Sequence, residues 1–279
     1  MTNSKFVQIT KDQNGREAIM VRVDKTLKEV MEEKPASRWS AEYWHPKYET
    51  ILKDLSRWQT STLEELEGEE AVISGDHVRK SKGESKGYDL GTGIEYYETK
   101  GFLPTAYDSS KIKECSPNAY QRLIATAVKQ NDILISCAGV GGVGEARSCF
   151  VSNVPTKKSC IGDVFIIRVK KIDPYFFLIF LNSQFGKLQI LREQTGVGTV
   201  NINTSQVLKI RTPNLSAKII NNIRKEYLEI LKIHDKAMEG KEKSDEGAYK
   251  NNIETAEKML KDLIARTEAV IRGERKDVI

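Results

Sequence analysis

The sequence predicts an α+β protein with one domain of mixed short strands and helices, a long helical coiled-coil tail and a small N-terminal β-hairpin extension. Three observations support this prediction. Residues 61–214 alternate short apolar segments with Gly, Ser, Asn and Pro, which is typical of short strands joined by loops. Residues 215–239 contain no Gly or Pro and space their apolar side chains by three and four, as amphipathic helices do. Residues 5–11 and 16–23 alternate loosely around the turn signal Asp12-Gln13-Asn14-Gly15.

These patterns divide the chain into a hairpin extension (1–36), a linking helix (37–60), the mixed domain (61–214) and the helical tail (215–279). In the linking segment Ser40 is a candidate helix cap, and the apolar spacing predicts a helix from about Pro46 to Arg57. Four aromatic side chains here have helical spacing, and we expect packing rather than base stacking from them: Trp39, Tyr43, Trp44 and Tyr48.

Within the mixed domain, short apolar runs bounded by turn residues predict strands near residues 71–74, 94–97, 132–137, 147–152 and 163–169. Two helices are expected between and after them. One covers Asn118 to Lys129. The other covers Pro174 to Arg192, where a proline opens the helix and apolar side chains line one face.

The tail carries an apolar stripe that is interrupted at Gly240 to Gly247. The stripe consists of Ile220, Ile223, Tyr227, Ile230 and His234, and then Ile253, Ala256, Leu260, Leu263, Thr267 and Val270. The two helices either fold back as a hairpin or extend with a kink at the break. The stripe is either the core of an ordinary intramolecular bundle or a seam that also meets another chain.

Composition indicates a cytoplasmic protein. Hydrophobic residues make up 39% and charged residues 30%, and no apolar run approaches the roughly 20 residues of a membrane span. The first residues lack a hydrophobic segment followed by a cleavage site. The four cysteines form no C-x-x-C pair and the three histidines are scattered, so we expect reduced thiols and no metal site.

Two segments could carry chemistry. Gly139, Gly141 and Gly144 satisfy the G-x-G-x-x-G spacing of a dinucleotide or S-adenosylmethionine site, but a strand and a loop are expected after them instead of the required helix. Five acidic residues form a second cluster, which we expect to be a solvated face: Glu64, Glu65, Glu67, Glu69 and Glu70. No phosphate loop, zinc-protease motif or nucleophile elbow is present in the sequence, and we expect no catalytic residue and no cofactor in this chain.

The cationic surplus belongs to the middle of the chain. The net charge is only +5, but residues 71–213 hold 19 Lys/Arg against 12 Asp/Glu, whereas residues 215–279 balance 14 against 13. Three polar loops in this region, 79–88, 155–159 and 196–203, have the composition of phosphate-contacting loops. The candidate DNA contacts are Arg79, Lys80, Lys82, Lys86, Lys157 and Lys158, with Thr199, Asn201 and Asn203 as candidate base or phosphate contacts.

The order of four segments resembles the target-recognition domain of type I restriction-modification specificity subunits. They are Ile73-Ser74-Gly75 running to Gly93–Tyr97, Asn131–Ser136 followed by Gly139–Gly144, Asp173–Phe176 with Phe180–Ser183 and Gly186, and Gly196 through Asn201 to Pro213. The chain has room for one such domain and one helical tail, where a full subunit has two domains. Asn131 stands where the family has glycine. The chain resembles a half-subunit.

The resemblance implies a non-catalytic subunit that binds double-stranded DNA. A separate DNA adenine methyltransferase subunit would hold S-adenosylmethionine, a restriction and translocase subunit can join the assembly, and the tail is a candidate for pairing two copies. Two other hypotheses stay open. One is a small S-adenosylmethionine- or dinucleotide-dependent enzyme built on Gly139–Gly144, and the other is a coiled-coil scaffold or regulator without DNA binding.

Overall fold

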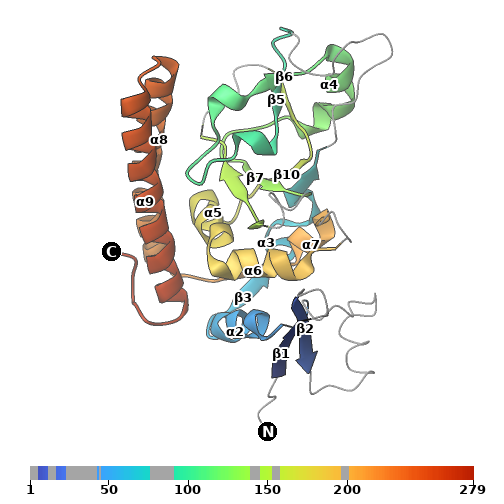
Figure 1. Cartoon of the computed structure of the whole chain (residues 1–279), viewed down its shortest axis with the longest axis vertical. Coiled ribbons are helices and arrows are strands. Elements are labelled where there is room, and N and C mark those ends of the chain that lie inside the picture. Colours follow the sequence, from blue (N-terminus) through green and yellow to red (C-terminus); the bar gives the residue numbers. More distant parts are fainter. Residues whose placement is uncertain are drawn as a thin grey trace.

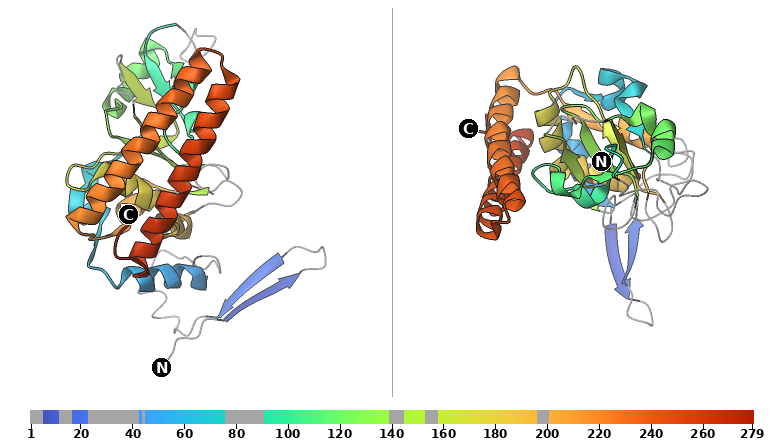
Figure 2. Two further views of the ribbon diagram at one scale, coloured as in Figure 1. Left: turned by 90° about the vertical axis from the view of Figure 1, so that its left-hand side faces the viewer. Right: turned by 90° about the horizontal axis from the view of Figure 1, so that it is seen from above.

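A computed structural model describes residues 6–11, 17–22, 43, 45–75, 91–138, 145–152, 158–195 and 201–279. It confirms the α+β class. A domain of short strands and helices stands beside a pair of long antiparallel helices, α8 and α9 (Figure 1). Seen from above, the helical pair forms a separate layer against one side of the domain (Figure 2). Among the described residues, no helix has the length and apolarity that a membrane crossing needs.

The centre of the domain is a four-stranded antiparallel sheet with the order β4-β10-β7-β8. Its strands are β4 (Val72–Ser74), β7 (Ile133–Ser136), β8 (Ser148–Phe150) and β10 (Val164–Ile167). All four lie where the sequence predicted strands. Strands β7, β8 and β10 are buried along their whole length, because helices and loops cover both faces of the sheet.

Two smaller sheets complete the domain. One has the order β6-β5-β9, with β5 (Glu95–Tyr97) antiparallel to β6 (Lys113–Glu114) and parallel to β9 (Ser159–Ile161). The other pairs β3 (Thr60–Thr62) with β11 (Arg211–Pro213). Only β5 was predicted. The others lie in stretches with no more than two consecutive apolar residues, so they show little of the pattern by which a strand is recognised in sequence.

The shorter helices begin at local caps. Helix α2 (Pro46–Leu55) confirms the predicted linking helix, and His45 rather than Ser40 caps it, accepting a hydrogen bond from the Lys47 amide at 3.2 Å. Helices α3 (Leu63–Glu67) and α7 (Thr204–Leu208) each begin with a capping box but were not predicted. Helix α4 (Pro117–Leu123) ends earlier than the predicted Lys129, and a 3-10 turn, Ile124–Thr126, follows it.

The predicted helix from Pro174 to Arg192 is wrong as a single element. It is two helices, α5 (Pro174–Asn182) and α6 (Gln184–Glu193), separated at Ser183, whose ψ of 165° is extended. Gly186 makes this sharp junction possible, because a Cβ there would lie 2.4 Å from the Phe180 carbonyl oxygen and 2.5 Å from the Leu181 Cα. Apolar periodicity continues through the junction, so the pattern did not reveal the break.

The tail is a helical hairpin, which decides between the two predicted geometries. Helix α8 (Ala217–Glu242) runs through the predicted break at Gly240, and α9 (Glu246–Ile271) begins after a turn of only three residues. The apolar stripe is buried within the chain: ten of its members are buried and Ile220 is half-buried. A second chain would therefore have to contact other faces of the tail.

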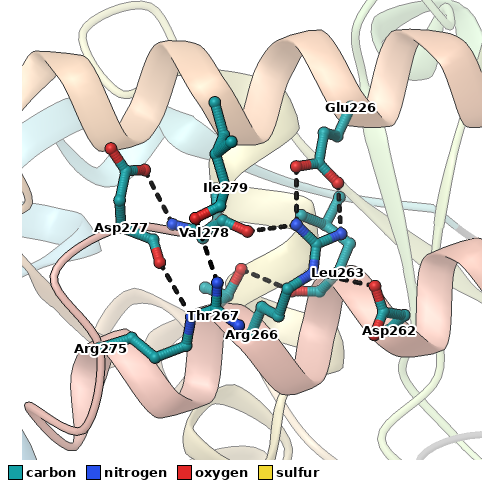
Figure 3. Close-up of polar contacts among 9 residues, drawn as sticks. All are labelled: Glu226, Asp262, Leu263, Arg266, Thr267, Arg275, Asp277, Val278 and Ile279. Atoms are coloured by element: carbon teal, nitrogen blue, oxygen red, sulfur yellow. Dashed lines mark hydrogen bonds and ion pairs between the residues drawn. The ribbon is translucent and has the colours of Figure 1, made fainter.

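Residues after α9 fold back onto the helical hairpin (Figure 3). Arg266 joins three segments there: it pairs with Glu226 of α8 and with Asp262 of α9, and it donates a hydrogen bond to the Val278 carbonyl. Asp277 accepts hydrogen bonds from the Asn222 side chain at 3.0 and 3.1 Å and pairs with Lys218 at 3.1 Å. These contacts hold the segment in place over a fully buried Val278.

The N-terminal hairpin forms as predicted, with β1 (Phe6–Lys11) antiparallel to β2 (Glu17–Arg22) in the register Phe6↔Arg22. The aromatic segment after it is described in part. Tyr43 and Tyr48 are buried at 3% and 1% exposure, which confirms packing, and the Arg192 guanidinium lies 4.3 Å from the Tyr43 ring centre. Trp39 and Trp44 lie outside the described residues.

We predict that Gly186→Ala destabilises the protein by about 1 to 3 kcal/mol, because the added methyl group overlaps backbone atoms of α5. The matched control is Gly247→Ala in α9, where the nearest atom to a new Cβ is an Asp245 carboxylate oxygen at 3.5 Å. That change should be neutral or slightly stabilising, since alanine favours helix. Urea unfolding of both variants measures the difference. Equal stabilities would show that the α5–α6 junction has room for a side chain.

Candidate nucleic-acid interface

Four strand ends meet at one edge of the central sheet. We call it the loop edge and define it by Gly75, Ala138 and Gly162, which lie next to strand ends, and by Asn201, which forms an isolated bridge with Ala138. Strands β4 and β7 end at this edge, and β10 and β8 begin there, as the pairings Val164↔Ser136 and Ile135↔Ser148 require. The Gly75 amide donates to the Val164 carbonyl at 3.0 Å. An isolated bridge joins Ala138 to Asn201, and Asn201 exchanges two backbone hydrogen bonds with Thr195.

The backbones at the loop edge approach so closely that glycine is required. A Cβ on Gly75 would lie 2.1 Å from the Gly162 carbonyl oxygen, and a Cβ on Gly162 would lie 2.2 Å from the Tyr96 hydroxyl. Gly75 belongs to the Ile73-Ser74-Gly75 segment singled out in the sequence. Because it has no side chain, Gly75 lets the end of β4 pack against the turn at Gly162 before β10. The Gly162 amide in turn donates to the Tyr97 carbonyl of β5 at 2.8 Å.

The opposite edge of the sheet is held by a buried ion pair. Asp132, 1% exposed, accepts two hydrogen bonds from the Arg168 guanidinium at 2.7 and 2.8 Å and one from the Lys129 amide at 2.7 Å. Asn131, directly before it, adopts a left-handed φ of +67°. This conformation suits glycine and, among other residues, asparagine, which explains physically why Asn131 can stand where the resembling family has glycine.

Most of the predicted DNA contacts lie outside the described residues: Arg79, Lys80, Lys82, Lys86, Lys157 and Thr199. Their flanks are described. Gly75, before residues 76–90, and both Thr195 and Asn201, on either side of residues 196–200, lie at the loop edge. Ser152, before residues 153–157, follows β8 and lies at the opposite edge. Described residues that flank two of the three predicted loops therefore lie at the loop edge.

Lys158, Asn201 and Asn203 are described and exposed. Lys158 directly precedes β9, and its ammonium group lies 5.8 Å from the centre of the Tyr120 ring. Asn203 caps α7: its side-chain oxygen accepts from the Gln206 amide at 3.0 Å and from the Ser205 hydroxyl at 2.8 Å. Asn203 thus has a structural role that its position three residues before Gln206 already indicates.

The glycine segment, residues 139–144, lies outside the described residues, but its flanks bear on the cofactor hypothesis. Strand β7 precedes the segment and β8 follows it, paired antiparallel with β7. The predicted strand after the glycines is confirmed. A dinucleotide site of the G-x-G-x-x-G kind needs a helix at this point, with its N-terminal amides facing the phosphates. The topology around the segment therefore differs from that of such a site.

The acidic cluster is only in part the solvated face that we expected. Glu67 accepts three backbone hydrogen bonds, from the amides of Lys170, Lys171 and Ile172 at 2.7 to 2.9 Å. Glu65 completes the capping box of α3, and its hydrogen bonds with Thr62 hold its pKa below the usual range. Glu64, Glu69 and Glu70 are exposed. The prediction was wrong for Glu67, because its partners lie about 100 residues away in sequence.

Polar contacts that the sequence did not indicate fasten α8 to the domain. Asp173 both caps α5 and pairs with Arg224 of α8. Further along α8, the Thr105 hydroxyl lies 2.7 Å from His234 Nδ1, and the Tyr227 hydroxyl donates to the Thr105 carbonyl. Lys241 pairs with Asp108. The domain and the tail thus make contact along most of the length of α8.

A second set of contacts fastens α9. Glu268 accepts a hydrogen bond from the Gln184 amide at 2.6 Å and so caps α6 from the tail. Trp58 donates to the Ile271 carbonyl at 2.8 Å, and Arg57 to that of Arg272 at 3.0 Å. The domain and the tail are consequently one packed body, because these contacts lie at both ends of the tail.

No protein-family model and no curated protein matches the chain. The solved structures to which it is similar include two type I restriction-modification structures. One is described as "Structural basis underlying complex assembly and conformational transition of the type I R-M system" (TM-score 0.42, 13% identity, 84% of this chain covered), and the other is the HsdS subunit from Thermoanaerobacter tengcongensis (TM-score 0.37, 13% identity, 89% covered). In both, the match spans 56% of the solved chain, little more than half its length.

We predict that acid weakens the contact between tail and domain through His234. Burial lowers the pKa of His234 from its ordinary value, because the charged imidazolium is poorly solvated there. The unfolded chain, with a histidine pKa of about 6.5, then binds more protons than the folded one below that pH. The free energy of unfolding should fall by up to about 1.4 kcal/mol per pH unit as the pH drops below about 6.5.

Urea unfolding between pH 7.5 and 5.5 measures this slope. The variant His234→Gln, which cannot take up the proton, should show a smaller slope across the same range. An unchanged slope in the variant would assign the pH dependence to other groups.

Proposed function

We propose that this chain is a sequence-specific double-stranded DNA-binding subunit of a restriction-modification assembly, performs no chemistry itself, and directs a separate adenine methyltransferase to its target. One observation carries the proposal. Three segments that the sequence marks as polar, glycine-rich or basic, residues 76–90, 139–144 and 196–200, have flanking residues at the loop edge. A rigid sheet that presents several loops at one edge is how many folds bring variable side chains to a ligand.

The described strands form a packed support, and most of the predicted DNA contacts belong to loops attached to it, which agrees with this proposal. The described strands at the loop edge are tightly packed, and there is no room for a side chain at Gly75 or Gly162. Loops attached to such a support can differ in sequence while the fold stays the same. Cations on phosphates would fix the position on the duplex, and polar side chains at base edges would supply specificity.

The tail supplies the surface for partners in this proposal. Its apolar stripe is buried, and the exposed face of the hairpin carries charged residues of both signs. The methyltransferase would dock along helix α8 and hold S-adenosylmethionine, a nuclease and translocase subunit can join, and two copies would recognise a two-part site. Light scattering of the chain alone and in the complex tests the pairing of copies, and one copy in both states would contradict it.

The rival hypotheses have direct tests. Micromolar binding of S-adenosylmethionine or a dinucleotide by the isolated chain, measured by calorimetry, would support the enzyme built on Gly139–Gly144. A scaffold without DNA binding would retain its activity when the candidate cations are replaced. The antiparallel strand β8 after the glycine segment makes the enzyme the weaker rival.

The deciding experiment is single-molecule sequencing of methylated adenines in cells that express the chain together with the methyltransferase. We expect modification confined to one motif. Methylation scattered over all sequence contexts would contradict the proposal, and so would methylation that is unchanged when the chain is left out.

We predict that replacing Lys80, Lys82, Lys157 and Lys158 together by Ala weakens DNA binding at all sequences to a similar degree, because phosphate contacts carry no sequence information. The dependence of log K on log salt should become shallower by about 0.9 for each phosphate that is no longer neutralised. Fluorescence anisotropy over a salt series measures both. The control is Lys258→Ala with Lys261→Ala on α9, which should leave affinity and slope unchanged, and equally weakened binding in both sets would contradict the assignment.

A further inference from the structure

A groove runs between α8 and the domain, at the sheet edge opposite the loop edge. It consists of two adjoining cavities of about 470 and 380 Å³ that share Gln130 and Asn131 as lining residues. The domain contributes Arg168–Asp173 and Ser152 to its walls, and α8 contributes residues between Ala217 and Asp235. At 1.5 Å per residue, this part of α8 gives the groove a length of roughly 27 Å. We call it the α8 groove.

The α8 groove has more unpaired cations than unpaired acids. Six cations line it, and three of them have acidic partners within the chain: Arg168 with Asp132, Arg224 with Asp173, and Lys232 with Glu229 at 2.6 Å. Lys170, Lys171 and Lys225 are exposed and form no ion pair within the described part of the chain. Asp235 is the one lining acid that has no such pair there, and burial raises its pKa.

The floor of the groove is apolar. Phe150 and Tyr175 lie with ring centres 5.2 Å apart, and Leu231 is buried beside them. Leu228 stands at the surface of α8 at 37% exposure, one of three large hydrophobic side chains that are exposed among the described residues. It projects from a helix face on which Lys225 and Lys232 lie three and four residues away. An apolar floor between unmatched lysines is the pattern of an interface with a polar rim.

We propose that the α8 groove is the docking site for an acidic polypeptide segment of the methyltransferase subunit, a proposal that rests on the function proposed above. Carboxylates of the segment would pair with Lys170, Lys171 and Lys225, and its apolar side chains would cover Leu228 and the exposed edge of Tyr175. Such pairing gives specificity and a faster encounter, while the apolar contact contributes affinity.

The apolar floor favours a polypeptide over DNA as the occupant. Phosphates and sugars would gain little from Leu228, which lies between the lysines of α8 where a duplex backbone would have to pass. Asp235 and Glu229 also line the groove at its far end, where they would repel phosphates but could accept hydrogen bonds from a peptide backbone. The groove also lies away from the loop edge, so a protein segment bound in it would leave the loop edge accessible.

The experiment compares two charge-reversed proteins of equal net charge in complex formation with the methyltransferase subunit. The test protein carries Lys170→Glu, Lys171→Glu and Lys225→Glu. The control carries Lys258→Glu, Lys261→Glu and Lys276→Glu, three exposed tail lysines that do not line the groove. We expect the test protein to bind the methyltransferase about 10- to 100-fold more weakly than wild type, and the control to bind as wild type. The separate variant Leu228→Ser should weaken binding about 3- to 10-fold while leaving DNA affinity unchanged.

Surface plasmon resonance gives the affinities, and circular dichroism confirms folding. Equal methyltransferase affinity in wild type and test protein would overturn the docking site and leave the proposed function standing. A loss of DNA affinity in the test protein, without a loss of methyltransferase affinity, would also overturn it and would assign the groove to DNA. A wild-type chain that forms no complex with the methyltransferase and shows no preferred DNA motif would overturn the proposed function together with the groove.

Discussion

The burial of helix α5 on all its sides is the constraint on which the rest of the structure depends. Every residue from Phe176 to Leu181 is at most 2% exposed. A helix that is apolar all round cannot lie at a surface, so it needs neighbours in every direction. Helix α5 contacts α6, β8 of the central sheet, and both helices of the tail. The tail is consequently part of the same hydrophobic core as the sheet. This core holds the tail against the domain, and the polar contacts of Asp173, His234 and Glu268 fix its orientation there.

The sequence revealed the large elements and missed the small ones, for a physical reason. Helices α8 and α9 carry a periodic apolar stripe, the four central strands lie in runs of at least three consecutive apolar residues, and all were predicted. Strands β6 and β9 lie in stretches with at most two consecutive apolar residues, and their pairing partners are distant in the chain. The break at Ser183 was missed because it follows from how closely Gly186 approaches α5, which periodicity does not express.

For the candidate interface, the sequence indicated the kinds of residue but not how they are arranged. Composition pointed to basic and polar loops, and residues that flank two of these loops lie at the loop edge, whereas Ser152, which flanks the third, lies at the opposite edge. Roles that arise from contacts far along the chain were not predictable. Glu67 looked like one more surface acid, yet it binds three amides that follow it by 103 to 105 positions. Asn203 is the opposite case. Its capping role is local, and Gln206 three residues later in the sequence indicates it.

Where the tail ends, it meets the helix that leads into the domain. Trp58 and Arg57 contact the carbonyls of Ile271 and Arg272, so a body of more than 200 residues begins and ends at nearly the same point. A unit with adjacent ends can be inserted into another chain, duplicated in tandem or circularly permuted without disturbing its core, because any join lies outside it. The hydrogen bonds from Trp58 and Arg57 bring these two points of the chain together, so a circular permutant joined there should keep the packing of domain and tail.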